Sequence, residues 1–240
     1  MEVLYRSTRG NEESVSASKA ILEGLASDGG LFVPQALPSF DKTLDEFAQM
    51  DYRQTAYEVM KLLLTDFTEE ELRYCIDKAY DGKFDTEAIA PLAEVKNAWY
   101  LELFHGPTCA FKDFGAGFMG RMTGLLGAAD EKLVILTATS GDTGSAVAHG
   151  FYNVPGVEVV LLYPEGKISR LQECQMTALG GNIHPLRVAG TFDDCQRLVK
   201  ELFADAPFRK RRRVTSANSI NLLRWIPQAF YYFYGYCQWR

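Results

Sequence analysis

The chain has 240 residues, of which 47% are hydrophobic and 23% are charged, and its formal net charge is −6 at pH 7. This composition is typical of a globular protein with an apolar core, and the acidic balance argues against nucleic acid as a partner. No apolar run approaches the roughly 20 residues of a membrane span, so we expect no membrane partner. No basic segment followed by an apolar stretch marks a secretion signal.

The cysteines and histidines argue against a metal-dependent or disulfide-bonded protein. The five cysteines are an odd number, lie far apart and form no C-x-x-C pair. This pattern fits reduced thiols in a cytoplasmic protein better than a disulfide framework or a zinc site. The three histidines are also far apart in the sequence, and we expect no metal site.

The first part of the chain, residues 1–90, is predicted to be a mostly helical lobe. Its predicted elements are helices at 16–26, 43–64 and 68–80 and a short strand at 31–33. The glycine pair at 29–30 ends the first helix. Thr68 is expected to cap the last helix, whose first turn is rich in glutamate, where the helix dipole favours acids.

The second part, residues 91–240, alternates apolar strands with helices. Strands are predicted at 99–104, 133–138, 157–163, 183–188 and 213–216, and helices at 111–128, 143–152, 168–179, 192–203 and 220–239. Continuous apolar strands that alternate with helices favour a parallel sheet covered on both faces. The sequence therefore predicts the α/β fold class, with a helical lobe followed by a three-layer region.

The most chemically informative segment runs from Phe104 to Gly115 and contains Lys112. A lysine enclosed by phenylalanines is poorly solvated as an ammonium ion. Desolvation lowers the pKa of a lysine, and a neutral amine is a nucleophile that can form a Schiff base. Lys112 is therefore our first candidate for a catalytic residue, and Thr108 is a candidate cap for the helix that follows. The alternative is a surface lysine whose stem covers apolar surface.

A glycine-containing turn, residues 139–145, lies between an apolar strand and a helix. Backbone N–H groups at such a helix N-terminus form an anion site. The turn does not match G-x-G-x-x-G and lacks the lysine of a P-loop, so a nucleotide site has weak support. The same residues could instead serve only to cap the helix.

A polar segment, Asn218 to Asn221, opens the last predicted helix and is followed by Arg224. Asn218 or Ser219 could cap this helix, and Asn221 and Arg224 share a face because they are three residues apart. An arginine there could hold a phosphate through its bidentate fork, or it could be a surface arginine. The basic run at 209–213 is interpreted as a solvated turn before a strand.

Several of these segments, in the same order, resemble the threonine synthase family of fold-type-II pyridoxal-phosphate (PLP) enzymes. The resemblance covers most of the chain, and several separate motifs are more specific than one. The motifs that carry it are Tyr5-Arg6-Ser7-Thr8-Arg9-Gly10, Gly24-Leu25-Ala26-Ser27-Asp28-Gly29-Gly30-Leu31-Phe32-Val33-Pro34, Phe104-His105-Gly106-Pro107-Thr108, Ala110-Phe111-Lys112-Asp113, Thr139-Ser140-Gly141-Asp142-Thr143-Gly144-Ser145, Tyr163-Pro164-Glu165-Gly166-Lys167, Gln175-Met176-Thr177, Phe192-Asp193-Asp194-Cys195-Gln196 and Ser216-Ala217-Asn218-Ser219-Ile220-Asn221 with Arg224 and Pro227-Gln228.

The resemblance implies a tryptophan synthase β-like fold, PLP as cofactor, and a lyase that converts O-phosphohomoserine and water to threonine and phosphate. It implies that Lys112 is catalytic and binds the cofactor, together with Phe111 and Asp142. Asp142 would contact the phenolic oxygen of the cofactor or only brace its loop. The implied substrate-binding residues are Ser140, Gly141, Thr143, Gly144 and Ser145 for the carboxylate, and Asn218, Ser219, Asn221 and Arg224 for the phosphate.

The resemblance also bears on the end of the chain. The family's chains continue past position 240 and carry there a second glycine-rich loop, for the cofactor phosphate, and a hydroxyl residue facing the pyridine nitrogen. We therefore expect the N-terminal portion of a longer protein or a shortened relative, with little activity alone, and self-association through the apolar helix at 220–239. Competing interpretations are a phospho-lyase that degrades O-phosphohomoserine, an inactive fragment, and a nucleotide-binding module.

Overall fold

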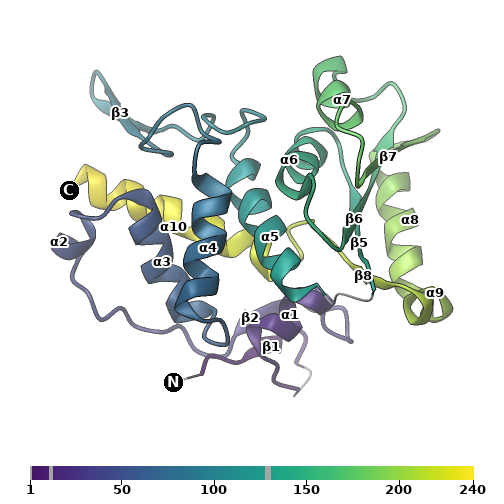
Figure 1. Cartoon of the computed structure of the whole chain (residues 1–240), viewed down its shortest axis with the longest axis horizontal. Helices are drawn as coiled ribbons and strands as arrows, with labels where there is room; N and C mark the ends of the chain where they lie inside the picture. Colours follow the sequence, from purple (N-terminus) through teal and green to yellow (C-terminus); the bar gives the residue numbers. More distant parts are fainter. Residues whose placement is uncertain (1, 11–12, 128–130) are drawn as a thin grey trace.

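The computed structural model describes residues 2–10, 13–127 and 131–240, and it has a parallel sheet on one side and a group of helices on the other (Figure 1). The sheet has four strands in the order β7-β6-β5-β8, all parallel. Their bounds are β5 Leu133–Ala138, β6 Val157–Pro164, β7 Ile183–Val188 and β8 Arg213–Thr215. This confirms the predicted α/β class with a parallel sheet.

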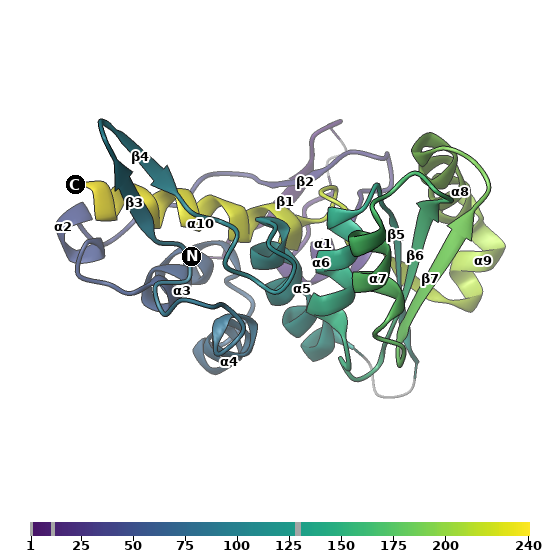
Figure 2. The same cartoon turned by 90° about the horizontal axis from the view of Figure 1, so that it is seen from above.

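Helices cover both faces of the sheet, as Figure 2 shows from above. One face carries α8 Phe192–Ala204, and α9 Ala206–Arg211 follows it; the other carries α5 Lys112–Leu126, α6 Asp142–Phe151 and α7 Arg170–Thr177. The α8 side has its own apolar cluster, in which Leu136 and Leu162 of the sheet are buried with Cys195 and Val199 of α8. The predicted three-layer arrangement is thus present.

The helical side is built on α5 and on the last helix, α10 Leu222–Trp239, which pack against α1 Ala17–Glu23, α3 Tyr52–Leu63 and α4 Glu69–Tyr80. An aromatic cluster fills the space between these helices: the rings of Tyr52 and Tyr80 lie 5.3 Å apart, and each lies within 6.4 Å of the rings of Phe114 and Phe230. Tyr80 donates a hydrogen bond from its hydroxyl to the carbonyl of Phe114 at 2.9 Å. A single apolar core therefore runs from the N-terminal helices into the sheet.

Two helices of the N-terminal part differ from the prediction, one by an interruption and one by an early end. The predicted helix at 43–64 is two helices, α2 Leu44–Phe47 and α3, because Asp51 is extended and forms a capping box with Gln54 at the start of α3. Helix α1 stops at Gly24, whose φ of +73° suits glycine, rather than at the glycine pair at 29–30. Predicted position 128 of the helix at 111–128 lies outside the described residues.

The predicted strand at 99–104 is wrong as a member of the parallel sheet. Residues β3 Leu92–Val95 and β4 Ala98–Leu101 form a separate antiparallel hairpin, whose turn holds Lys96 at a φ of +56°. Trp99 and Tyr100 are about half exposed, so this apolar run is not a buried central strand. A second antiparallel pair joins β1 Tyr5–Ser7, which the sequence prediction missed, to β2 Phe32–Pro34.

The C-terminal region also differs from the prediction. The basic run at 209–213 lies mostly on helix α9 rather than on a turn, because Asp205 caps that helix and a proline stands in its first turn. Helix α10, with Pro227 inside it, is largely buried within this chain. None of the described helices is both long enough and apolar enough to cross a bilayer.

Candidate active site

Lys112 opens α5 and lies directly beside Asp142, the first residue of α6. Its Nζ donates a hydrogen bond to Asp142 Oδ2 at 2.8 Å and lies 4.4 Å from the centre of the Phe111 ring. The Lys112 side chain is 20% exposed, so the amine is partly sheltered yet reachable. The hydrogen bond from Lys112 lowers the pKa of Asp142 below its ordinary value. The structure therefore brings Lys112, Phe111 and Asp142 together.

The phenylalanine enclosure predicted around Lys112 is only partly present. Phe111 covers one side of the amine and is itself 40% exposed. Phe114 is buried in the core and does not cover the amine, because Lys112 and Phe114 are two residues apart on the helix and point to nearly opposite sides of it. The neighbours of the Lys112 amine are thus an aromatic face and a carboxylate, both of which attract positive charge.

The turn between β5 and α6 is held in place by Thr139. Its hydroxyl oxygen accepts hydrogen bonds from the N–H groups of Gly141 at 3.0 Å and Gly144 at 2.7 Å. The N-cap residue of α6, Gly141, makes no side-chain cap, and the N–H of Thr143 has no partner among the described residues. Ser145 is fully buried, and its hydroxyl lies 3.3 Å from the carbonyl of Gly141. Ser140 is exposed at the tip of the turn.

Gln172 of α7 is a member of this site that the sequence analysis missed. Its side-chain amide donates to Asp142 Oδ1 at 3.0 Å, while its carbonyl oxygen accepts from Ser169 in a capping box. A Cβ atom on Gly141, whose φ is +133°, would overlap this amide, so the close approach requires glycine. The Ser169-x-x-Gln172 spacing predicts the capping box, but nothing in the sequence reveals the second bond to Asp142.

Arg224 lies behind the first turn of α5 and is only 2% exposed, so the interpretation of it as a surface arginine is wrong. Its Nη1 donates to the carbonyl of Lys112 at 3.2 Å, whereas its buried Nε has no hydrogen-bond partner in the described part of the chain. Burial lowers the pKa of Arg224 to about 10, although the charge of Asp113 opposes this shift. Gly115 makes room for it, because a Cβ there would lie 2.9 Å from Nη1.

The segment from Asn218 to Asn221 divides between the site and the interior. The Asn218 amide donates to the carbonyl of Ala138 at 3.1 Å, so Asn218 lies at the same strand end as the turn at 139–145. Ser219 is exposed. Asn221 is fully buried, caps α10 by accepting from the N–H of Leu223, and donates to the carbonyl of Ile21. The predicted cap at 218 or 219 is therefore wrong.

The loop before Lys112 is fastened by Asp113. Its carboxylate accepts from the N–H of Thr108 at 2.8 Å and from the Thr108 hydroxyl at 2.7 Å. Thr108 therefore does not cap α5, which has no side-chain cap. Burial raises the pKa of Asp113, while these two hydrogen bonds oppose the rise. The described residues contain no group of three or more metal-ligating side chains.

Two family models match the chain. The model described as "Threonine synthase N terminus" matches residues 4–80, and the model described as "Pyridoxal-phosphate dependent enzyme" matches residues 85–228. The second match covers more than half of the chain and contains Lys112, the turn at 139–145 and Arg224.

The most informative relatives and solved structures carry the same name. The threonine synthase of Pseudomonas aeruginosa is 42% identical over 98% of this chain, and that of Escherichia coli is 44% identical over 95% of it. The crystal structure of PLP-bound threonine synthase from Brucella melitensis superimposes with a TM-score of 0.90 at 37% identity over 99% of the chain, and the yeast enzyme gives 0.89 at 36% over 98%. The chain covers 51% and 52% of the two curated relatives and 52% and 50% of the two solved chains, so it spans about half their length.

Proposed function

The chain belongs to the pyridoxal-phosphate-dependent enzyme family and resembles threonine synthases from end to end, and we propose that it acts as a threonine synthase. The reaction is the conversion of O-phosphohomoserine and water to threonine and phosphate, with PLP as cofactor. The observation that carries this proposal is the Lys112 amine, 2.8 Å from Asp142, which is the first residue of α6. The names of the relatives favour a synthase over a phospho-lyase.

The residues of the site fit the cofactor. Lys112 offers a reachable primary amine to the aldehyde, Phe111 offers an aromatic face beside that amine, and Asp142 offers a carboxylate oxygen. PLP, when bound, supplies an electron sink that stabilises negative charge on the carbon atoms of the substrate. The domain boundary predicted near residue 90 and the roles of individual site residues are part of this proposal.

Proton transfer is the task of Lys112 and Asp142. The Lys112 amine is the base that this site offers to an acidic carbon of the substrate. Asp142 accepts a hydrogen bond from Nζ and stabilises the positive charge that the amine gains with the proton. Gln172 keeps Asp142 in position through its other oxygen.

Anion binding is the task of the α6 N-terminus and of the positive charge behind α5. The N–H of Thr143 and the dipole of α6 suit the substrate carboxylate, with Ser140, Gly141 and Gly144 shaping the turn. Asn218 and Ser219 lie at or next to the same strand end. The buried Arg224 adds positive potential that favours a phosphorylated substrate, even though its guanidinium is not exposed.

We propose a cytoplasmic location, because an odd number of widely spaced cysteines suits a reducing compartment better than a disulfide framework does.

Self-association through α10 is a further part of the proposal, supported by the exposed aromatic side chains of Tyr232, Tyr236 and Trp239. Light scattering coupled to size-exclusion chromatography measures the mass directly. A monomer at every concentration would contradict self-association.

A borohydride trapping experiment tests the assignment of Lys112. The purified protein is incubated with PLP, reduced, digested and mapped by mass spectrometry, and the label is expected on Lys112. Lys112→Ala should lose the label, whereas Lys132→Ala, which removes an exposed lysine, should keep it. Label spread over surface lysines would contradict the assignment.

Product analysis is a separate test of the reaction. Release of threonine and phosphate from O-phosphohomoserine supports a synthase, whereas formation of a keto acid identifies a phospho-lyase.

A further inference from the structure

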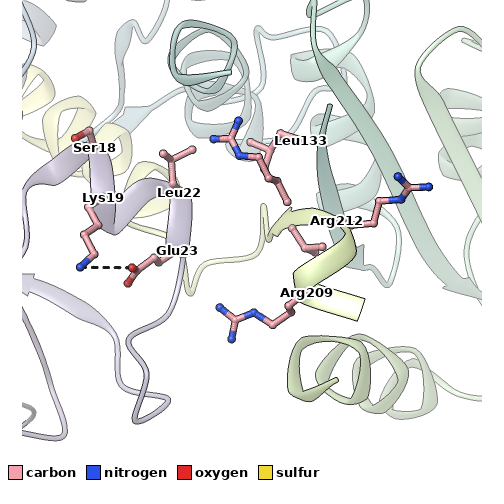
Figure 3. Close-up of a pocket in the computed structure, with 9 residues that line it drawn as sticks. Ser18, Lys19, Leu22, Glu23, Leu133, Arg209 and Arg212 are labelled. Atoms are coloured by element: carbon pink, nitrogen blue, oxygen red, sulfur yellow. Dashed lines mark ion pairs between the residues drawn. The ribbon is translucent and has the colours of Figure 1, made fainter. Parts of the chain in front are cut away.

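A cavity of about 440 Å³ lies between α1 and the segment that joins α9 to β8 (Figure 3). Lys19 and Glu23 line it from α1, and Arg209, Arg212 and Arg213 line it from the other side. Leu133, the first residue of β5, forms part of its apolar lining. This volume suits a small molecule, because ligand pockets commonly have volumes of roughly 300–1,000 Å³.

The lining of this cavity carries an excess of positive charge in an otherwise acidic chain. Lys19 pairs with Glu13 at 2.6 Å and lies 3.8 Å from Glu23, the only carboxylate among the lining residues. None of the three arginines forms an ion pair with any residue that the structure describes. A guanidinium group without an ion-pair partner is a charge that a bound anion can neutralise.

The arginines of the lining extend in different directions. In Figure 3 the side chain of Arg209 extends from α9 toward Glu23 of α1, whereas Arg212 turns its guanidinium away from α1. Arg213 is more enclosed, and its buried Nη1 has no hydrogen-bond partner among the described residues. Arg209 and Arg213 are therefore the two groups best placed to bind an anion, and the apolar lining suits a ligand with a carbon skeleton.

The cavity is distinct from the proposed active site. Leu133 and Arg213 are register partners at the amino-terminal ends of β5 and β8, whereas Ala138 ends β5 beside the turn at 139–145. A strand of six residues spans roughly 17 Å. The cavity therefore lies at the amino-terminal ends of the strands, whereas Lys112 lies at their carboxyl-terminal ends.

We propose that this cavity binds a small polyanion of the phosphate class, such as a phosphorylated metabolite, through Arg209 and Arg213. Arginine suits this ligand because its planar fork matches two phosphate oxygens. The ligand would bridge α9, which carries Arg209, and the start of β8, which carries Arg213. The inference does not depend on the reaction proposed for Lys112.

Isothermal titration with pyrophosphate at constant ionic strength tests the site. We expect saturable 1:1 binding that weakens at least tenfold in Arg209→Gln and in Arg213→Gln. Arg211→Gln is the matched control, because it removes an arginine of the same helix that does not line the cavity, and its affinity should stay within twofold. Lys112→Ala should also bind normally. Far-UV circular dichroism verifies that each variant is folded.

Three results would overturn the site. Absence of saturable binding to the folded wild-type protein would rule it out. An equal loss in Arg211→Gln and Arg209→Gln would mean a diffuse basic surface, and single-stranded RNA binding with the same pattern would identify that surface as a nucleic-acid one. Loss of binding in Lys112→Ala would place the anion in the active site instead. Because Arg209 is exposed, Arg209→Gln decides the matter even if Arg213→Gln fails to fold.

Discussion

Asp142 accepts hydrogen bonds from two side chains, the Lys112 amine and the Gln172 amide, that reach it from different helices. Its own side chain is 48% exposed, so this network lies at the surface of the protein rather than in its core. An exposed network is adjustable, because either donor can leave at low cost. This suits a lysine that has to exchange partners during a reaction.

The Lys112–Asp142 pair should give stability a weak acid dependence. The hydrogen bond from Lys112 lowers the Asp142 pKa in the folded state. The pair therefore stabilises the fold fully above the unfolded aspartate pKa of about 3.9 and loses that effect as pH falls through the lower folded value. Because the pair is exposed, Asp142→Asn should cost about 0.5 kcal/mol at pH 7 and almost nothing at pH 2.5. Urea unfolding at both pH values measures this, and an equal difference at both would refute it.

Thr139→Val should destabilise the turn that begins α6. Valine has nearly the same shape but leaves the N–H groups of Gly141 and Gly144 without their acceptor. An unsatisfied buried donor costs about 1–3 kcal/mol, so the free energy of unfolding should fall by about 2 kcal/mol. Thr123→Val is the matched control, because the buried Thr123 hydroxyl has no hydrogen-bond partner in the described ranges and its loss should be neutral or stabilising. Equal effects in denaturant titrations would contradict the role of Thr139.

Helix α5 is the element on which the site depends, because it carries Lys112 and packs on both α6 and α10. Two glycines allow α5 and α6 to cross closely. A Cβ on Gly120 would overlap the carbonyl oxygen of Gly150, and a Cβ on Gly150 would lie 2.5 Å from the carbonyl oxygen of Ala116. This contact fixes the position of Lys112 relative to Asp142 at the start of α6.

A pair of substitutions on α5 tests this packing. Gly120→Ala should lower the free energy of unfolding by about 2 kcal/mol, since overpacking a core usually costs 1–3 kcal/mol. Gly117→Ala should instead raise it by about 0.5–1 kcal/mol, because alanine favours helix and its Cβ would meet only an ordinary contact, 3.5 Å from Ala79. Thermal and denaturant unfolding compare the two. A stable Gly120→Ala protein would show that α5 and α6 can move apart without cost.

Elements with a strong local signal were predictable from sequence, and the exceptions have physical reasons. The continuous apolar run of β5 and the polar turn after it predicted the strand and helix α6, whereas only the family resemblance implied that Lys112 and Asp142 belong to one site. The hairpin strand β4 looked the same locally, because Trp99 and Tyr100 are apolar although they are half exposed. Gln172 and the burial of Arg224 depend on contacts between distant segments, which no local pattern encodes.

At the scale of the molecule, one core joins the parts that the two family models match separately. Tyr80 donates from its hydroxyl to the carbonyl of Phe114, and Asn221 donates to the carbonyl of Ile21 across 200 residues. Tyr52 of α3 contacts the rings of Phe114 in α5 and Phe230 in α10. Neither part therefore buries its apolar surface without the other.

The chain should accordingly unfold in a single transition. Circular dichroism at ~222 nm follows the loss of helix, and fluorescence follows the surroundings of Trp99, Trp225 and Trp239. Because the core is shared, the two denaturation curves should coincide. Two separate transitions, or a cooperatively folded fragment of residues 1–80 alone, would contradict this expectation.

The hydrogen bond between Asn221 and Ile21 also has a consequence for biosynthesis. The partner of the Ile21 carbonyl is translated 200 residues later, which at 5–20 residues per second is a delay of roughly 10–40 s. During that interval the apolar face of α1 cannot pack against α10, because the ribosome has not yet synthesised that helix. The nascent chain should therefore bind ribosome-associated chaperones until α10 emerges.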